Sequence, residues 1–201
     1  VDPVHIPVWG LYVTTPEVSD EKATVHASVE LLNASASDQV ATLEITLLDP
    51  SGMEVARAEK ELALATGEEI QADFDMSLEN PVIWDIEHPD LYTCMAGLKI
   101  GRKQVQKTSS TFGLRNFQWT ANDGFHLNGR RVQLYGVNLH HDQGPLGAAF
   151  FPRAMERQLE IMQEMGVNAL RTSHNACAPE VLELCDRMGI IVFNELFDKY
   201  G

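Results

Sequence analysis

The feature of this sequence that most constrains its fold is a repeated unit between residues 132 and 195. Two amphipathic segments, 153–165 and 179–188, each end at a Met-Gly pair and lead directly into a short apolar run. A helix that stops at glycine and passes at once into a buried strand is typical of βαβ units. Because such connections join parallel strands by right-handed crossovers, the repeat predicts three parallel strands.

Three parallel strands of this kind occur both in closed barrels and in open, doubly wound sheets. The open sheets that bind dinucleotides carry Gly-x-Gly-x-x-Gly after their first strand, and Gly144-Pro145-Leu146-Gly147 does not replace that motif. We therefore expect the first part of an α/β TIM barrel, with three βα units. A closed barrel needs eight strands and about 250 residues, so we expect the barrel to be incomplete.

The first half of the chain has a different periodicity. Apolar and polar residues alternate from residue 22, as in the run that contains Val25, Ala27 and Val29, and such runs recur up to Phe112. Alternation with a period of two predicts strands that turn one face inward. About seven short strands in roughly 100 residues, separated by turn signals, predict an immunoglobulin-like β-sandwich.

These two patterns define the expected organisation of the chain. Residues 1–15 contain prolines and show no periodicity, so we interpret them as a linker. We expect the β-sandwich to occupy residues 16–113 and the truncated barrel to occupy residues 114–201. The sequence begins at Val1 with no signal-like segment, so we expect the native start to be absent. The compartment stays open between the bacterial periplasm and the cytoplasm.

The composition argues against several classes of binding partner and of site. The net charge of −14 disfavours nucleic acid and anionic membranes, since both are bound through basic patches. No run of 18 apolar residues occurs, so we expect no membrane-spanning helix. Cys94, Cys177 and Cys185 are too few and too unevenly spaced for a disulfide framework or a zinc site.

Polar side chains that could take part in chemistry follow each of the predicted parallel strands. They are Asn138, His140, His141 and Asp142 after the first strand, Arg171 and His174 after the second, and Glu195 after the third. The carboxyl ends of barrel strands are where ligands bind. Neutral imidazole can both donate to and accept from hydroxyl groups, and a guanidinium group suits a carboxylate. The three histidines also have the ligand type of a zinc hydrolase, without a known zinc spacing.

Several motifs, in order along the chain, resemble those of glycoside hydrolase family 2, and most closely its β-galactosidase-like members. They are Trp84 followed by Pro89-Asp90-Leu91-Tyr92, then Phe112-Gly113-Leu114-Arg115, the hairpin from Phe125 to Gly129, the segment from Gly136 to Asp142, and the segment from Gly166 to Asn175. Together these motifs cover nearly the whole chain. The resemblance implies an interior fragment of such an enzyme.

The resemblance also implies roles for individual residues. His140, His174, Asp142 and Asn138 are expected to bind substrate, and Arg171 to orient the nucleophile. Glu195 and Asp198 are expected to support these groups without being catalytic. The family places its acid/base and nucleophilic glutamates after the fourth and seventh strands, so we expect neither in these residues. Tyr200 stands where some relatives have a magnesium-binding histidine, so we expect no metal, and we expect no cofactor.

The expected function is that of a retaining enzyme that cleaves terminal β-linked sugars, most closely a β-galactosidase. β-Glucuronidase and β-mannosidase activities of the same family are alternatives, and a non-catalytic carbohydrate- or protein-binding β-sandwich module is a third. The expected partner is a β-linked oligosaccharide or glycoside. We expect the fragment itself to be inactive, and we expect its truncated barrel to self-associate through open strand edges.

Overall fold

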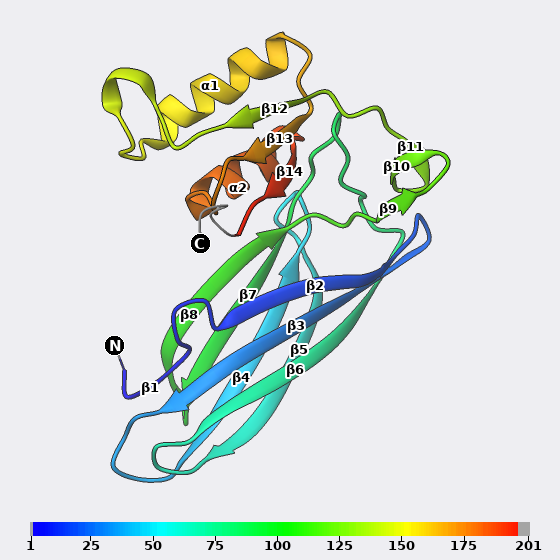
Figure 1. Cartoon of the computed structure of the whole chain (residues 1–201). Helices are drawn as coiled ribbons and strands as arrows, with labels where there is room; N and C mark the ends of the chain where they lie inside the picture. Colours follow the sequence, from blue (N-terminus) through cyan, green and yellow to red (C-terminus); the bar gives the residue numbers. More distant parts are fainter. Residues whose placement is uncertain (1, 197–201) are drawn as a thin grey trace. The chain divides into compact units, whose positions relative to one another are not determined.

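The computed structural model describes residues 2–196, which form two compact units (Figure 1). One unit contains residues 2–83 and 91–115, and the other contains residues 84–90 and 116–196. The first is an antiparallel β-sandwich and the second begins an α/β barrel. None of the helices within residues 2–196 has the length and apolar character that crossing a bilayer requires.

The sandwich consists of two four-stranded sheets. In the first sheet β3 is central, with β1 and β2 on one edge and β6 on the other; the second sheet has the order β5-β4-β7-β8. The strands are β1 (Val4–His5), β2 (Leu11–Val18), β3 (Lys22–Asn33), β4 (Gln39–Leu48), β5 (Glu54–Leu64), β6 (Glu69–Glu79), β7 (Tyr92–Ile100) and β8 (Lys103–Phe112).

The alternation seen in the sequence produces the sandwich core. Every second residue of β3 from Ala23 to Leu31 is fully buried, and so is every second residue of β4 from Ala41 to Leu47. Since successive side chains of a strand point to opposite faces, each sheet supplies one apolar face to the space between the sheets. The predicted β-sandwich is therefore confirmed.

The interpretation of residues 1–15 as a linker differs from the structure. β1 and β2 both pair antiparallel with β3 within these residues. The ladder between β2 and β3 skips from Thr14 to Glu17, so Thr15 and Pro16 form a bulge. Proline lacks an amide hydrogen and is tolerated at bulges and edges. The prolines interrupt the alternation of β2, which forms a strand because it pairs with β3.

The second unit begins with a small antiparallel sheet of three strands. These are β9 (Phe117–Thr120), β10 (Gly124–Leu127) and β11 (Arg130–Arg131). Asn128 and Gly129 connect β10 to β11 with φ angles of 51° and 75°. A two-residue hairpin turn with positive φ at both central positions is the geometry that Asn-Gly favours.

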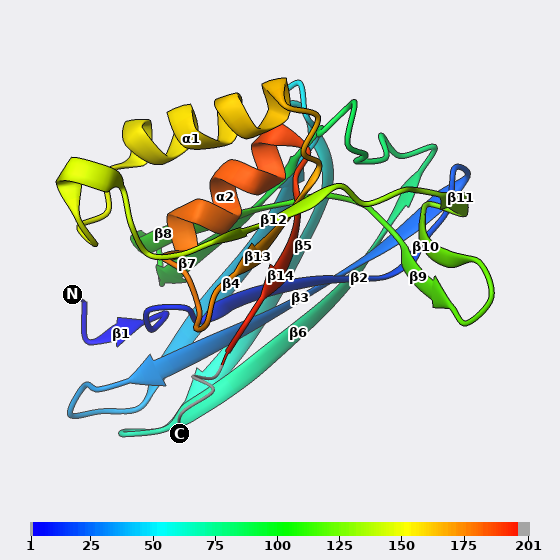
Figure 2. The same cartoon turned by 45° about the horizontal axis from the view of Figure 1, so that its top comes forward.

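Two βα units follow, and they give three parallel strands with two α-helices on one face of their sheet (Figure 2). The strands are β12 (Gly136–Leu139), β13 (Ala169–Thr172) and β14 (Ile191–Asn194), and the helices are η1 (Gly144–Leu146), α1 (Pro152–Glu164) and α2 (Pro179–Met188). The core between sheet and helices contains Leu159, Leu170 and Leu184. The predicted start of a TIM barrel is confirmed.

The segment 84–90 belongs to the barrel unit although it lies between two sandwich strands in the sequence. The Trp84 side chain is fully buried, and its indole Nε1 donates to the backbone carbonyl of Asp186 at 2.7 Å, near the end of α2. Asn128 donates to the Trp84 carbonyl at 2.9 Å, and Arg130 forms a 3.0 Å ion pair with Asp85. This segment therefore joins the hairpin to the end of α2.

Candidate functional site

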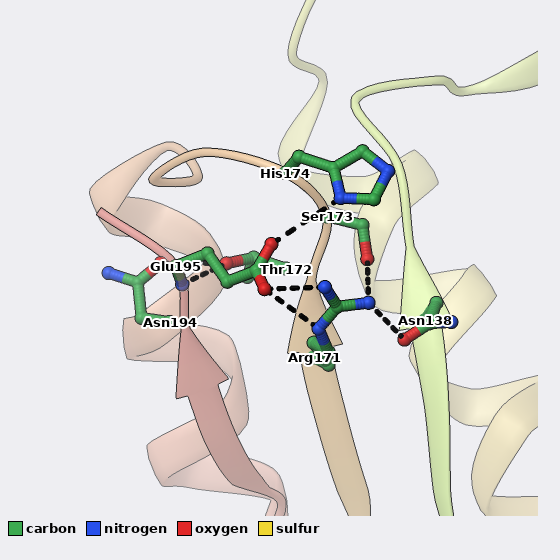
Figure 3. A network of polar contacts seen from close by, with 7 residues as sticks. All are labelled: Asn138, Arg171, Thr172, Ser173, His174, Asn194 and Glu195. Carbon is green, nitrogen blue, oxygen red and sulfur yellow. Dashed lines mark hydrogen bonds and ion pairs between the residues drawn. The ribbon is translucent and has the colours of Figure 1, made fainter. Parts of the chain in front are cut away.

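The candidate site lies where the three parallel strands end. In the register of the sheet, Asn138 of β12 stands beside Arg171 of β13, and Thr172 stands beside Asn194 of β14. Glu195 follows β14 directly. Because parallel strands bring their carboxyl ends to one edge, side chains about 60 residues apart in the sequence come together there, as Figure 3 shows.

Arg171 is the centre of this network (Figure 3). Its Nε and one terminal nitrogen donate to Oε1 of Glu195, at 2.9 and 2.5 Å. Its other terminal nitrogen donates to Oδ1 of Asn138 at 3.2 Å and to Oγ of Ser173 at 3.3 Å. A planar guanidinium group with several fixed donors can make such contacts together. Arg171 thereby connects all three strand ends.

Glu195 uses its two carboxylate oxygens differently. Oε1 accepts both bonds from Arg171, and Oε2 lies 3.6 Å from Nδ1 of His174. The side chains of Glu195 and Arg171 remain 31% and 41% exposed, so solvent screens their attraction in part. Both oxygens of the Glu195 carboxylate therefore have a neighbour within the chain, Arg171 for one and His174 for the other.

The two histidines predicted to bind substrate lie side by side. The ring centroids of His140 and His174 are 5.4 Å apart, with an angle of 68° between the rings. This edge-to-face arrangement is a favourable one for aromatic rings. The Ser173–His174 peptide bond, which places the second ring, is cis. His140 is exposed and His174 is partly exposed, so both rings are open to a ligand at the rim.

Asp142 has a different surrounding from that of the Arg171 network. Its Oδ1 accepts the amide hydrogen of Gly144 at 2.7 Å, and its backbone carbonyl accepts from Gln158 at 3.4 Å. The buried Gln143 then binds the backbone of Phe151 through both ends of its amide, at 3.1 and 3.4 Å. Asp142 therefore shapes the loop after β12.

A small cavity of about 60 Å³ lies behind the rim. Its walls include His140, His141 and Asp142 from the first loop and Thr172 and Cys177 from the second. Most of its lining is apolar, and burial raises the pKa of the Cys177 thiol. His141 belongs to this cavity rather than to the contacts drawn in Figure 3.

Three members of the network were not assigned a role in the site from the sequence. Thr172 donates to Asn194 Oδ1 at 2.9 Å and accepts the Glu195 amide hydrogen at 2.9 Å, and Ser173 accepts from Arg171. Only the register of β13 with β14 reveals the partners of Thr172. Asp198 lies outside the described residues.

The predicted absence of a metal is not tested by the structure and stays a prediction. Within residues 2–196, no group of three or more His, Cys, Asp or Glu side chains is arranged to hold a metal ion. The alternative of a zinc hydrolase built on His140, His141 and His174 thus finds no support in the positions of those side chains.

Comparison with known proteins places the chain in a family. The family profile described as "Glycosyl hydrolases family 2" matches residues 4–115, and the profile of the TIM barrel domain of the same family matches residues 120–197. The β-galactosidase BoGH2A of Bacteroides ovatus is 40% identical over 98% of this chain, which corresponds to 23% of that protein. A β-glucuronidase of Bacteroides fragilis is 30% identical over 98% of this chain and 28% of its own length.

Solved structures give the same result. A glycosyl hydrolase family 2 member from Bacteroides cellulosilyticus matches 98% of this chain and 27% of its own, with a TM-score of 0.93 and 37% identity. Bacteroides uniformis β-glucuronidase 2, covalently bound to cyclophellitol-6-carboxylate aziridine, matches 96% of this chain and 24% of its own, with a TM-score of 0.91 and 28% identity. The chain spans about a quarter of the length of these relatives. It belongs to glycosyl hydrolase family 2.

Proposed function

We propose that these 201 residues form part of a retaining glycoside hydrolase that cleaves terminal β-linked sugars. The observation that carries the proposal is the meeting of Arg171, His174, Glu195 and Asn138 at the carboxyl ends of three parallel strands, in a chain of this family. β-Galactosides are the favoured substrates, because a β-galactosidase at 40% identity is more similar than the β-glucuronidases at 27–31%.

The roles that we propose follow from what each group can donate or accept. His140 and His174 present imidazole nitrogens that can bind sugar hydroxyls. Arg171 orients the nucleophilic carboxylate of the enzyme, and Asn138 holds the guanidinium group through its 3.2 Å contact. Asp142 acts through the shape of its loop, since its carboxylate is engaged with the Gly144 amide.

Glu195 is proposed as a supporting residue rather than as the acid/base. Retaining glycosidases use two carboxyl groups about 5–5.5 Å apart, one protonated and one ionised. Both oxygens of the Glu195 carboxylate already have partners within the chain, since Oε1 accepts from Arg171 and Oε2 lies 3.6 Å from His174 Nδ1. We therefore propose that both catalytic carboxyl groups come from residues outside this chain, and that the 201 residues alone do not hydrolyse glycosides.

The decisive experiment uses the enzyme that contains this chain and two aryl glycosides, a β-galactoside and a β-glucuronide. We expect turnover of the β-galactoside, and we expect His140→Ala and His174→Ala each to lower kcat/KM by about tenfold or more. Preference for the β-glucuronide would select the alternative that the 30% identical relative favours. Binding of sugar with no turnover of either substrate would instead identify a non-catalytic carbohydrate-binding module.

The isolated chain provides a separate test of the proposed role of Glu195. The 201-residue protein is expected to show no turnover of an aryl β-galactoside. Turnover by this protein, together with its loss in Glu195→Gln, would assign Glu195 to catalysis and would contradict the supporting role.

A further inference from the structure

The hydroxyl group of Thr172 is buried at the end of β13, where it both donates and accepts a hydrogen bond. Thr172 is 1% exposed, and both of its hydrogen-bonding capacities are used. The amide of Glu195 can only donate, so Thr172 Oγ1 is the acceptor of that 2.9 Å bond. The single hydroxyl hydrogen is then available for Oδ1 of Asn194, also at 2.9 Å. The direction of each bond is thus determined by the chemistry of the partners.

The two bonds join the end of β13 to the end of β14. Thr172 and Asn194 stand beside one another in the register, on the face of the sheet opposite to that of Arg171. Thr172 holds the backbone of Glu195, while the Glu195 carboxylate meets Arg171 and lies near His174. The backbone of Glu195 is therefore held by a buried hydroxyl that makes no hydrogen bond to the side chain of Arg171 or His174.

Asn194 strengthens this arrangement. Its Oδ1 accepts from Thr172 and also lies 3.4 Å from the Cys177 amide, in the loop that precedes α2. Loss of a buried hydroxyl leaves its former partners, the Glu195 amide and Asn194 Oδ1, short of one hydrogen bond each. The backbone of Glu195 would then lose its hydrogen bond to β13.

We propose that Thr172 is a positioning residue of the site. Through the Glu195 amide it places the carboxylate that in turn orients Arg171 and His174. The effect of Thr172 on sugar hydrolysis rests on the proposed function. Its effect on the position of Glu195 rests only on the hydrogen bonds of residues 172, 194 and 195. A merely structural role would stabilise the fold without selectively affecting the contact between Glu195 and Arg171.

The test measures the Nε–H group of Arg171 by ¹H–¹⁵N nuclear magnetic resonance on the 201-residue chain. In the wild type this hydrogen is bound to Glu195 Oε1, so it exchanges slowly with solvent. Thr172→Val, which removes the hydroxyl and keeps the shape, is expected to speed this exchange by about tenfold. Thr172→Ser, which restores the hydroxyl, is expected to return it to within about twofold of the wild-type rate.

Internal controls separate positioning from loss of fold. Trp84 Nε1 donates to the Asp186 carbonyl at 2.7 Å within the barrel unit, so its exchange rate should not respond to Thr172 variants that keep this unit folded. Thr172→Ala removes the same hydroxyl with a different change in packing, and it replaces Thr172→Val if that variant loses the protected Trp84 signal. Glu195→Ala reports the full effect of losing both carboxylate oxygens.

The outcomes are distinct. Faster exchange in both hydroxyl-free variants, reversed by serine, supports the proposal. Unchanged exchange at Arg171 in those variants, with fast exchange in Glu195→Ala, would mean that the carboxylate is placed without Thr172, and the proposal would fail. An unchanged rate in Glu195→Ala, which removes the acceptor, would overturn it as well. None of these results depends on glycosidase activity, so failure of the proposed function would be recognised separately in the enzyme assay.

Discussion

One oxygen of Glu195 accepts two hydrogen bonds from Arg171, and the same guanidinium group reaches Asn138 and Ser173 with its remaining terminal nitrogen (Figure 3). A single side chain of β13 thus contacts β12 on one side and the residue that follows β14 on the other. On this face of the sheet one cation joins all three strand ends, while Thr172 and Asn194 join β13 to β14 on the other face. This arrangement makes the first prediction specific to arginine.

Arg171→Lys should destabilise the chain although the charge is kept. An ammonium group has its donors on one atom and cannot reach Glu195, Asn138 and Ser173 together. Because both members of the ion pair are partly exposed, we expect a modest loss of about 1 kcal/mol in the free energy of unfolding, measured with urea. Arg102→Lys, at the exposed turn after β7, is the control and should change stability by less than about 0.5 kcal/mol. Equal effects of the two variants would contradict the prediction.

Gly189 and Gly166 provide a matched pair at the ends of α2 and α1. Both have positive φ angles, 72° and 85°, so alanine costs about 1 kcal/mol at either position. A Cβ atom on Gly189 would lie 2.1 Å from the carbonyl oxygen of Ile86, whereas one on Gly166 would meet no atom within 4 Å. Gly189→Ala should therefore cost at least about 2 kcal/mol more than Gly166→Ala in urea unfolding. Equal costs would show that segment 84–90 does not lie against α2.

Much of the fold could be predicted because it depends on local patterns. Period-two alternation determines which face of β3 is buried, and Asn128-Gly129 determines the hairpin turn. The strands within residues 1–15 could not be predicted in this way. Their prolines interrupt the pattern, and β1 pairs with the far end of β3, where Val4 stands beside Asn33. Tertiary pairing decided the structure where the local sequence was ambiguous.

The candidate site was predictable at the level of strand ends but not of individual bonds. Arg171, His174 and Glu195 were expected at one edge, because parallel strands bring their carboxyl ends together. The engagement of Asp142 with the Gly144 amide is an Asx-type turn, a local signal that the sequence contains. The role of Thr172 depends on its register with Asn194, which no single-strand pattern specifies.

The three cysteines should differ in reactivity in a way that follows their burial. Burial raises the pKa of the Cys94 and Cys185 thiols to about 12, and it raises the pKa of the less buried Cys177 thiol. Only the thiolate reacts with disulfide reagents. In the native chain at pH 8, we expect slow reaction of Cys177 and protection of the other two until unfolding, as counted by mass spectrometry. Native reaction of Cys94 before Cys177 would contradict this order.

The same thiols predict a loss of stability at high pH. An unfolded thiol ionises near its ordinary pKa of 9, while folded Cys94 and Cys185 keep their protons up to about 12. Above pH 9 the unfolded state therefore binds fewer protons, so the free energy of unfolding falls as the pH rises towards 12. Cys94→Ala should flatten this decline in urea titrations at pH 8.5 to 10.5. An equally steep decline in the variant would assign the effect to other groups.

The isolated chain is expected to self-associate through the open edges of its parallel sheet and the exposed aromatic side chains beside them. In the described part of the chain, β12 and β14 each have one unpaired edge, and Phe193 of β14 is 43% exposed beside the exposed Trp119. Open edges and exposed aromatic groups favour association. Sedimentation velocity should show a sedimentation coefficient that rises with protein concentration.

Phe193→Lys should reduce this rise, because a charge opposes pairing at an edge. Val55→Lys is the matched control, since Val55 is also 43% exposed and lies on the edge strand β5 of the sandwich. If Val55→Lys alone abolished association, the sandwich edge rather than the barrel sheet would be the contact.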